Sequence, residues 1–183
     1  MEQKQKFTIS IFTENEVGLL QRVSGIFTRR HINIESITSS DSEIENVHRY
    51  TIVICEDLPL VKKLVLQLEK QVDVLKAFYH YEDDTIFQEV ALFKLATKIV
   101  ESGMRLEQIL RDNHARILSI EKEFLVIEKT GQEHEINTLF QKLKPFDILE
   151  FTRSGRVAIT KPMKTVQKHI EDLQLEKATI NLN

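Results

Sequence analysis

An internal repeat constrains the fold of this 183-residue chain more than any other feature of its sequence. The segment HINIESI, which starts at His31, matches HARILSI, which starts at His114, at four of seven positions. The same offset of 83 residues superimposes the apolar pairs Phe7/Val90, Ile9/Leu92, Val23/Leu106, Ile26/Ile109 and Phe27/Leu110. Further along, an offset of 75 superimposes Val61/Ile136, Leu64/Leu139, Val65/Phe140 and Leu68/Leu143. Two tandem copies of one supersecondary unit are the economical interpretation, and a chance match of hydrophobic periodicity is the alternative.

Each copy has the pattern of a βαββαβ unit. In the first copy, β-rich apolar runs predict strands over 7–12, 32–38, 47–55 and 73–81. Apolar residues at spacings of three and four predict one helix after Gly18 and another from Asp57-Leu58-Pro59, since proline is tolerated in a first helical turn. The acidic run 39–46 reads as a loop, and the loss of eight residues from the second copy fits a deletion there.

A βαββαβ unit folds as a four-stranded antiparallel sheet with both helices on one face. The fold class expected for the chain is therefore α+β, with two tandem ferredoxin-like domains separated at the polar run 82–85. The first strand carries Phe7, Ile9 and Ile11 on one face and a mixed set, Thr8, Ser10 and Phe12, on the other. We expect a partner or another copy to cover this second face, and hence oligomerisation.

Composition excludes several classes of protein. A hydrophobic content of 42% with 29% charged residues is typical of a globular chain. The net charge of −3 argues against general nucleic-acid binding. The apolar runs are shorter than a membrane span, and MEQKQKF lacks the apolar core of a signal peptide, so a cytoplasmic location is expected. Cys55 is the single cysteine and lies in the apolar run TIVIC, which favours a core residue over a reactive thiol.

The loop and helix start around Gly18 form the candidate site. A helix N-terminus offers free N–H groups and a positive dipole end, which together hold a carboxylate. Gly18 lets the backbone approach a ligand closely, and the amide of Asn33 can bind either an ammonium or a carboxylate group. The residues expected to wall an apolar pocket are Leu19, Leu20 and Ile34.

Each polar position of this candidate site also has a simpler interpretation. Gly18 and Asn33 are both common turn residues, and Asn15 is typical of an Asx turn or a helix cap. The repeat adds information, because the second copy replaces these three residues with Glu101, Arg116 and Lys98 respectively. A second copy with these substitutions cannot hold the same ligand in the same way.

Catalytic motifs are absent from the sequence. The six histidines show no HExxH spacing, and no G-x-S-x-G, P-loop or G-x-G-x-x-G motif occurs. The acids Asp41, Glu43 and Glu45 fit a solvated loop better than acid–base chemistry. A ferredoxin-like RNA binder is a further alternative, but HRYTIVI lacks the K/R-G-F/Y core of such domains.

Several segments resemble one known family. ENEVGLLQRVSGIFTRRHINIES, HRYTIVI and VLQLEKQVDVLKAF resemble the N-terminal ACT domain of the regulatory small subunit of acetolactate synthase. IEKTG and FTRSGRVAI are similar to that family's C-terminal domain. The expected limits are 6–82 for the ACT domain and 86–161 for the C-terminal domain. The tail 162–183 lies beyond the resemblance, and there Val166, Ile170 and Leu173 are spaced for a short amphipathic helix, with partial disorder as the alternative.

The resemblance implies a non-catalytic regulatory subunit that dimerises through its ACT domains. It implies that this chain activates a catalytic large subunit. It also implies that an effector inhibits that subunit, with valine as the main candidate and leucine and isoleucine as further candidates. Thiamine diphosphate, Mg²⁺ and FAD are then expected in the large subunit, with no cofactor or metal in this chain. Effector-binding residues carried over from the family are Asn15, Gly18, Leu19 and Leu20 from one subunit, with Asn33 and Ile34 from its neighbour.

The sequence departs from the family pattern in two places. Gln21 stands where a small polar residue is more usual, and Gln88-Glu89-Val90 replaces the family's Arg-Glu-Leu. The alternative hypothesis is an ACT-type amino-acid sensor that serves a different biosynthetic enzyme.

Overall fold

The computed structural model describes residues 4–98 and 104–161. Contacts divide the chain into two compact units. One unit runs to Ile86 and also includes the described residues from Ala158 onward, and the other is Phe87–Val157. The predicted tail helix around Ile170, and Glu101 as the counterpart of Gly18, lie outside the described residues.

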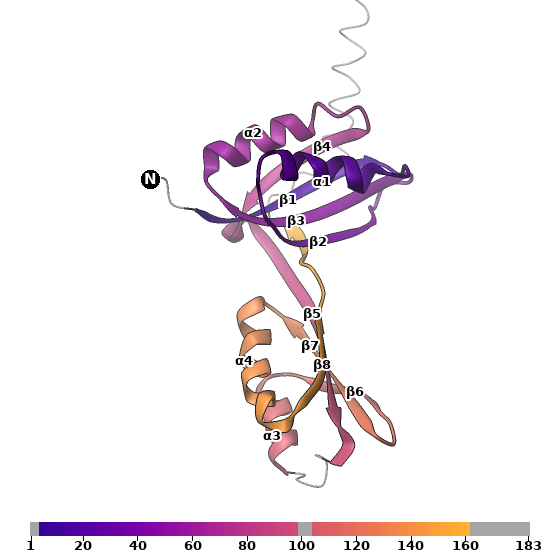
Figure 1. The fold of residues 1–183 in the computed structure, drawn as a ribbon, viewed down its shortest axis with the longest axis vertical. Helices are drawn as coiled ribbons and strands as arrows, with labels where there is room; N and C mark the ends of the chain where they lie inside the picture. The colour runs from indigo at the N-terminus through magenta and orange to yellow at the C-terminus, as the bar shows by residue number, and fades with distance from the viewer. Residues whose placement is uncertain (1–3, 99–103, 162–183) are drawn as a thin grey trace, which may run out of the picture. The chain divides into compact units, whose positions relative to one another are not determined.

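The first unit has the expected βαββαβ order (Figure 1). Its elements are β1 (Gln5–Glu14), α1 (Leu19–Arg29), β2 (Ile34–Asp41), β3 (Val47–Glu56), α2 (Leu58–Leu68) and β4 (Val74–Tyr81). The strands form an antiparallel sheet in the order β2-β3-β1-β4, so β2 and β4 are its edges. This order, with α1 and α2 together on one face, confirms the ferredoxin-like prediction for the first copy.

The core of the first unit lies between its sheet and its two helices. Phe7, Ile9 and Ile11 of β1 pack in one buried cluster with the apolar stripes of α1 and α2. The helix prediction from Asp57-Leu58-Pro59 is confirmed. The Asp57 side chain accepts a hydrogen bond from the Leu60 N–H at 2.8 Å and caps α2, whose first turn contains the proline.

The second unit repeats this order. Its elements are β5 (Thr85–Ala96), α3 (Met104–Asp112), β6 (Arg116–Ile120), β7 (Phe124–Gly131), α4 (Glu133–Leu143) and β8 (Ile148–Arg153). The strands pair in the order β6-β7-β5-β8, which corresponds strand for strand to the first sheet. The predicted alignment of Phe7 with Val90 was wrong by one residue, because Ala91 and not Val90 lies in the core, and Val90 is 40% exposed. A buried cluster that includes Phe93, Leu110 and Leu139 fills its core.

The repeat extends to backbone geometry that the sequence pattern does not reveal. His31 and His114 both adopt positive φ, at 55° and 50°, directly after α1 and α3. The N–H of His31 donates to the Thr28 carbonyl, and that of Ile32 donates to the Phe27 carbonyl. The same two bonds recur around His114. Both helices therefore end in a Schellman motif with histidine in the left-handed position, where glycine is usual.

Three local features differ from the sequence predictions or were not predicted. Strand β2 continues to Asp41, because Ser39, Ser40 and Asp41 pair with β3, so the acidic loop is shorter than predicted. The polar run 82–85, expected as the domain boundary, consists of a 3-10 turn, η1 (Glu82–Asp84), and the first residue of β5, Thr85. The division between the two compact units follows Ile86.

The third difference is an added strand. β9 (Val157–Thr160) pairs with β5, and its residues from Ala158 cluster with the first unit. A strand of four residues with a long-range partner leaves little signal in a local pattern.

The described residues contain no group of histidine, cysteine and acidic side chains arranged to hold a metal ion. Within the same ranges, no helix combines the length and the apolar character needed to cross a bilayer.

Candidate functional site

The loop that joins β1 to α1 lies at the surface of the first unit. Asn15 and Val17 are exposed, and Gly18 takes the N-cap position of α1 with φ 84°, in the left-handed region. A side-chain carbon added at Gly18 would meet no atom within 4 Å. The glycine is therefore required by its backbone conformation and not by crowding within the chain.

The N-terminus of α1 lacks a side-chain cap. Gly18 has no side chain to accept from the first-turn N–H groups of Leu19, Leu20 and Gln21, and no acidic residue lies in this turn. By contrast, α2 is capped by Asp57, and α4 has a capping box between Gln132 and Glu135. The exposed start of α1 thus keeps donors and a positive dipole end available to an external anion.

Asp73 holds the two ends of this loop. Its backbone carbonyl accepts from the Glu14 N–H at 3.1 Å, and its carboxylate pairs with Arg22 Nη1 at 2.5 Å. The end of β1 and the second turn of α1 are therefore both tied to the residue before β4. Sequence reasoning missed this brace, because nothing in a local pattern links Arg22 to Asp73.

The leucines predicted for the site point in different directions. Leu19 is 1% exposed and belongs to the core, so its backbone N–H, and not its side chain, faces the loop. Leu20 is 47% exposed and is the apolar side chain that the loop presents to solvent.

One chain does not bring Asn33 and Ile34 to the Gly18 loop. Ile34 pairs with Ile54, which pairs with Phe7 at the start of β1, whereas the loop follows Glu14 at the other end of that strand. Seven strand residues at about 3.3 Å each separate the two ends by roughly 23 Å. Asn33 is exposed beside the edge strand β2. A site that uses both regions needs a second chain.

The second copy uses the counterpart of Asn33 differently. Arg116 donates from Nε and Nη2 to Glu128 Oε2, at 2.9 and 2.6 Å. Lys98, the counterpart of Asn15, is exposed. Arg116 has only hydrogen-bond donors and a positive charge, so it cannot accept from a ligand ammonium as the amide oxygen of Asn33 can.

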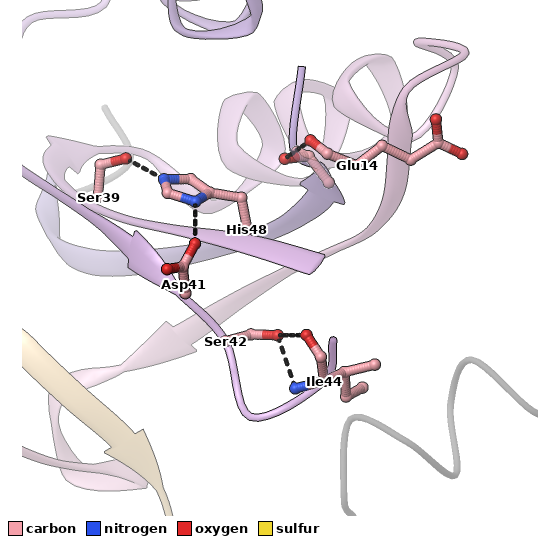
Figure 2. Close-up of polar contacts among 7 residues, drawn as sticks. Glu14, Ser39, Asp41, Ser42, Ile44 and His48 are labelled. Atoms are coloured by element: carbon pink, nitrogen blue, oxygen red, sulfur yellow. Dashed lines mark hydrogen bonds and ion pairs between the residues drawn. The ribbon is translucent and has the colours of Figure 1, made fainter. Parts of the chain in front are cut away.

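A chain of polar contacts ties the end of β2 to β3 (Figure 2). The Ser39 hydroxyl lies 2.6 Å from His48 Nε2, and His48 Nδ1 lies 3.2 Å from Asp41 Oδ1. This connectivity is that of a nucleophile–base–orienter set, but Ser39 and Asp41 are exposed residues of an edge strand. We interpret these contacts as structural hydrogen bonds that hold β2 against β3 at the edge of the sheet. They lie next to Thr13 of β1, because Thr13 also pairs with His48.

Two family models match the chain in succession. One, described as an AHAS small subunit-like ACT domain, matches residues 9–76. The other, described as the small subunit of acetolactate synthase, matches residues 88–162. Together they cover both copies of the repeat.

Relatives and a solved structure agree with these matches. The acetolactate synthase small subunit of Bacillus subtilis is 33% identical over 85% of this chain and 91% of that protein. A probable acetolactate synthase small subunit from Archaeoglobus fulgidus is 31% identical over 87% of this chain and 99% of that protein. The crystal structure of the Thermotoga maritima small subunit superimposes with a TM-score of 0.79 at 25% identity, over 87% of this chain and 99% of that one. The chain therefore belongs to the family of acetolactate synthase small subunits.

Proposed function

We propose that this chain is the non-catalytic regulatory subunit of an acetolactate synthase in branched-chain amino acid biosynthesis. It activates the catalytic large subunit and confers feedback inhibition by valine, in the cytoplasm. The observation that carries the proposal is the exposed, uncapped start of α1 at Gly18, in a chain whose other described helix starts, those of α2 and α4, are capped.

The start of α1 suits the carboxylate of an amino acid. The N–H groups of Leu19, Leu20 and Gln21 converge at the positive end of the helix dipole. Leu20 offers exposed apolar surface next to them, which fits a short branched side chain. The loop supplies no cation for an acidic effector side chain, since its nearest one, Arg22, is paired with Asp73.

A second copy completes the site with Asn33. Strand β2 is an edge of its sheet, so its outer backbone groups are open to another strand. If two β2 strands pair antiparallel about a two-fold axis, Ile34 of one chain lies opposite Asp41 of the other. Asp41 pairs with His48, and His48 pairs with Thr13 just before the loop. A dimer of this kind therefore brings Asn33 of one chain to the same end of the joined sheet as the Gly18 loop of the other. We propose that a ligand bound between them donates from its ammonium group to the amide oxygen of Asn33.

Valine at such an interface changes the balance between dimer arrangements. A ligand held by both chains binds one arrangement better, and linkage requires that this preference is passed on to whatever else binds the dimer. The thiamine diphosphate, Mg²⁺ and FAD chemistry belongs to the catalytic large subunit in this proposal. This chain contributes binding and regulation only.

Isothermal titration calorimetry with valine, leucine and isoleucine tests the sensor proposal, with D-valine as a matched control. We expect saturable binding of L-valine and weaker binding or none of D-valine, because the site reads both the carboxylate and the amine. Absence of binding by all three L-amino acids would refute it. Reconstitution with an acetolactate synthase large subunit, assayed with and without valine, then tests activation and inhibition separately.

The alternative is an ACT-type sensor for a different biosynthetic enzyme. Affinity purification of the tagged chain from the cells that naturally produce it distinguishes this alternative from the proposed function. Recovery of a thiamine-dependent synthase supports the proposed function, and recovery of another amino-acid biosynthetic enzyme supports the alternative.

A further inference from the structure

The edge strand β6 of the second sheet is short, apolar and exposed. Among the described strands it pairs with β7 only, so its other side is open (Figure 1). Three of its five residues are exposed apolar side chains, with Ile117 at 39%, Leu118 at 52% and Ile120 at 61%. An exposed apolar edge with open backbone groups is a template for another strand, and β6 contains neither the lysine nor the proline that commonly blocks such pairing.

The repeat shows that this apolar character is specific to the second copy. The register of β2 against β3 skips Glu35, and the register of β6 against β7 skips Leu118, so both strands have a β-bulge at the same position of the repeat. In the first copy, Glu35 is exposed and pairs with Lys6 at 3.4 Å. In the second copy, an exposed leucine replaces this charge at the edge of the sheet.

The two isoleucines of β6 lie at the margin of the second core. Ile117 pairs with Ile127, and Ile120 pairs with Leu125. Both partners are buried in the cluster that packs against α3 and α4. Ile117 and Ile120 therefore lie on the helix-covered face, at the edge where the cover ends. A further strand placed against β6 would extend the core over them.

The sequence of this edge is complementary to itself. Antiparallel alignment of RILSIE, residues 116–121, with a second copy places Arg116 opposite Glu121 at both ends. Between these ends, Ile117 lies opposite Ile120, and leucine lies opposite serine at the centre. Every contact occurs twice, as an interface about a two-fold axis requires. This complementarity favours a second copy of the chain over an unrelated strand.

The charged side chains at the two ends are accessible for this pairing. The Arg116 side chain is 72% exposed, and its bonds to Glu128 come from Nε and Nη2, which leaves Nη1 for a second carboxylate. Glu121 is exposed, and its Oε1 accepts from the Ser119 hydroxyl at 3.0 Å. A carboxylate has further acceptor sites for a guanidinium beside it.

We propose that β6 docks on β6 of a second copy of this chain, antiparallel and with Arg116 of each copy opposite Glu121 of the other. The pairing joins two second sheets into one and covers Ile117 and Ile120. It lies in the second unit and is separate from the β2 pairing of the proposed function. A five-residue strand makes a small contact, so we expect weak association through this edge and test it by covalent capture.

Cysteine pairs test both the partner and the register. In a chain without its native thiol (Cys55→Ala), Ile117→Cys of one copy faces Ile120→Cys of the other within disulfide reach. Identical positions are three residues apart along the paired strands, about 10 Å, which is too far for a disulfide. We expect an equal mixture of the two variants to form a cross-linked heterodimer about tenfold faster than either variant alone forms a homodimer under the same mild oxidation.

The opposite edge of the second sheet provides the matched control. Leu149 lies on β8 and is 53% exposed. A mixture of Leu149→Cys with Ile120→Cys should cross-link only at the slow rate of the single variants. A mixture of Ile117→Cys with Ile120→Cys that is no faster than this control would overturn the proposal, because β6 would then have no partner in a second copy.

Charge reversal at the end of β6 gives an independent readout. Glu121→Lys in both cysteine variants places two cations opposite each other at each end and should slow heterodimer formation about fivefold. Glu107→Lys changes the net charge equally at an exposed position of α3 and should leave the rate unchanged. Equal rates for the two charge variants would contradict the proposed pairing. The inference is independent of the proposed function, since none of these measurements involves valine or the large subunit.

Discussion

The two copies of the βαββαβ unit have the same scaffold but differ in the residues at the starts of their helices and strands. In the first copy, α1 starts at a left-handed glycine with no cap, and Asn33 at the start of β2 is exposed. In the second copy, the counterpart of Asn33 is Arg116, which is engaged with Glu128. Capping and ion pairing stabilise a chain, whereas unpaired donors at the surface suit a ligand. The difference supports the proposal that the first copy binds the effector and that the second has another role.

Gly18→Asp is the strongest test of this difference. It places a carboxylate where the ligand carboxylate is proposed to bind, and it should weaken valine binding by on the order of 100-fold through the loss of charge-assisted hydrogen bonds and the added repulsion. Inhibition of the reconstituted synthase by valine should disappear while activation remains. Enzyme assays over a valine titration, with calorimetry on the isolated chain, measure both effects.

Gly18→Asn is the matched control for that change. Asparagine has the size of aspartate, tolerates the left-handed conformation and adds no charge. There is open space around Gly18 for either side chain. It should therefore weaken valine binding less than Gly18→Asp does. Full valine sensitivity in the aspartate variant would exclude the start of α1 as the binding site.

The caps of the other helices should affect stability and not regulation. Asp57→Ala removes the acceptor for the Leu60 N–H and should lower the free energy of unfolding by about 1 kcal/mol. Gln132→Ala removes one side chain of the capping box of α4 in the second copy and should also lower the free energy of unfolding. Urea unfolding followed by circular dichroism measures the loss. Both variants should keep the wild-type response to valine, and an altered response would show that helix starts other than that of α1 take part in sensing.

The helix-free faces of the two sheets also differ, and pH should reveal it. On the second sheet, Lys94 pairs with Glu150 at 3.5 Å. On the first sheet, burial lowers the pKa of His80, the nearby Arg49 lowers it further, and Asp84 partly opposes them. His80 is therefore neutral in the folded chain at a pH where it takes up a proton in the unfolded chain. Stability is then unaffected above about pH 6.5 and falls as the pH drops from there towards the lowered pKa.

His80→Gln should remove part of this acid sensitivity. The measurement is the urea midpoint at about pH 7.5 and about pH 5.5, on either side of the ordinary histidine pKa. The wild type should lose more stability between the two than the variant does. An equal loss in both would assign the acid sensitivity to other groups.

Much of this architecture follows from the sequence, because the scaffold depends on periodic apolar residues. The spacing of Val23, Ile26 and Phe27, and its repetition at Leu106 and Leu110, indicates the helices and their faces without any knowledge of contacts. The features that escaped prediction depend on contacts between distant residues. One is the ion pair by which Asp73 holds Arg22 next to the loop, and the other is the contact of β9 with the first unit. Neither produces a recognisable pattern in the local sequence.

For the candidate site, the sequence indicates the chemistry but not the distances. Gly18 and Asn33 are recognisable because the second copy lacks them. The strand register shows that they lie at opposite ends of one sheet, so the requirement for a second chain emerges only from the structure.

The smallest expected effect tests a feature that both copies share. His31 and His114 occupy the left-handed position that ends α1 and α3, a conformation unfavourable for residues with a side chain. Replacement of either by glycine relieves this strain but increases the entropy of the unfolded chain, so the net gain in unfolding free energy should be about 0.5 kcal/mol. Urea unfolding of His31→Gly and His114→Gly should give gains of the same sign and similar size, because the two Schellman motifs have the same hydrogen bonds. A gain in one copy with a loss in the other would show that one histidine makes a compensating side-chain interaction, and that the two helix ends are equivalent in backbone geometry alone.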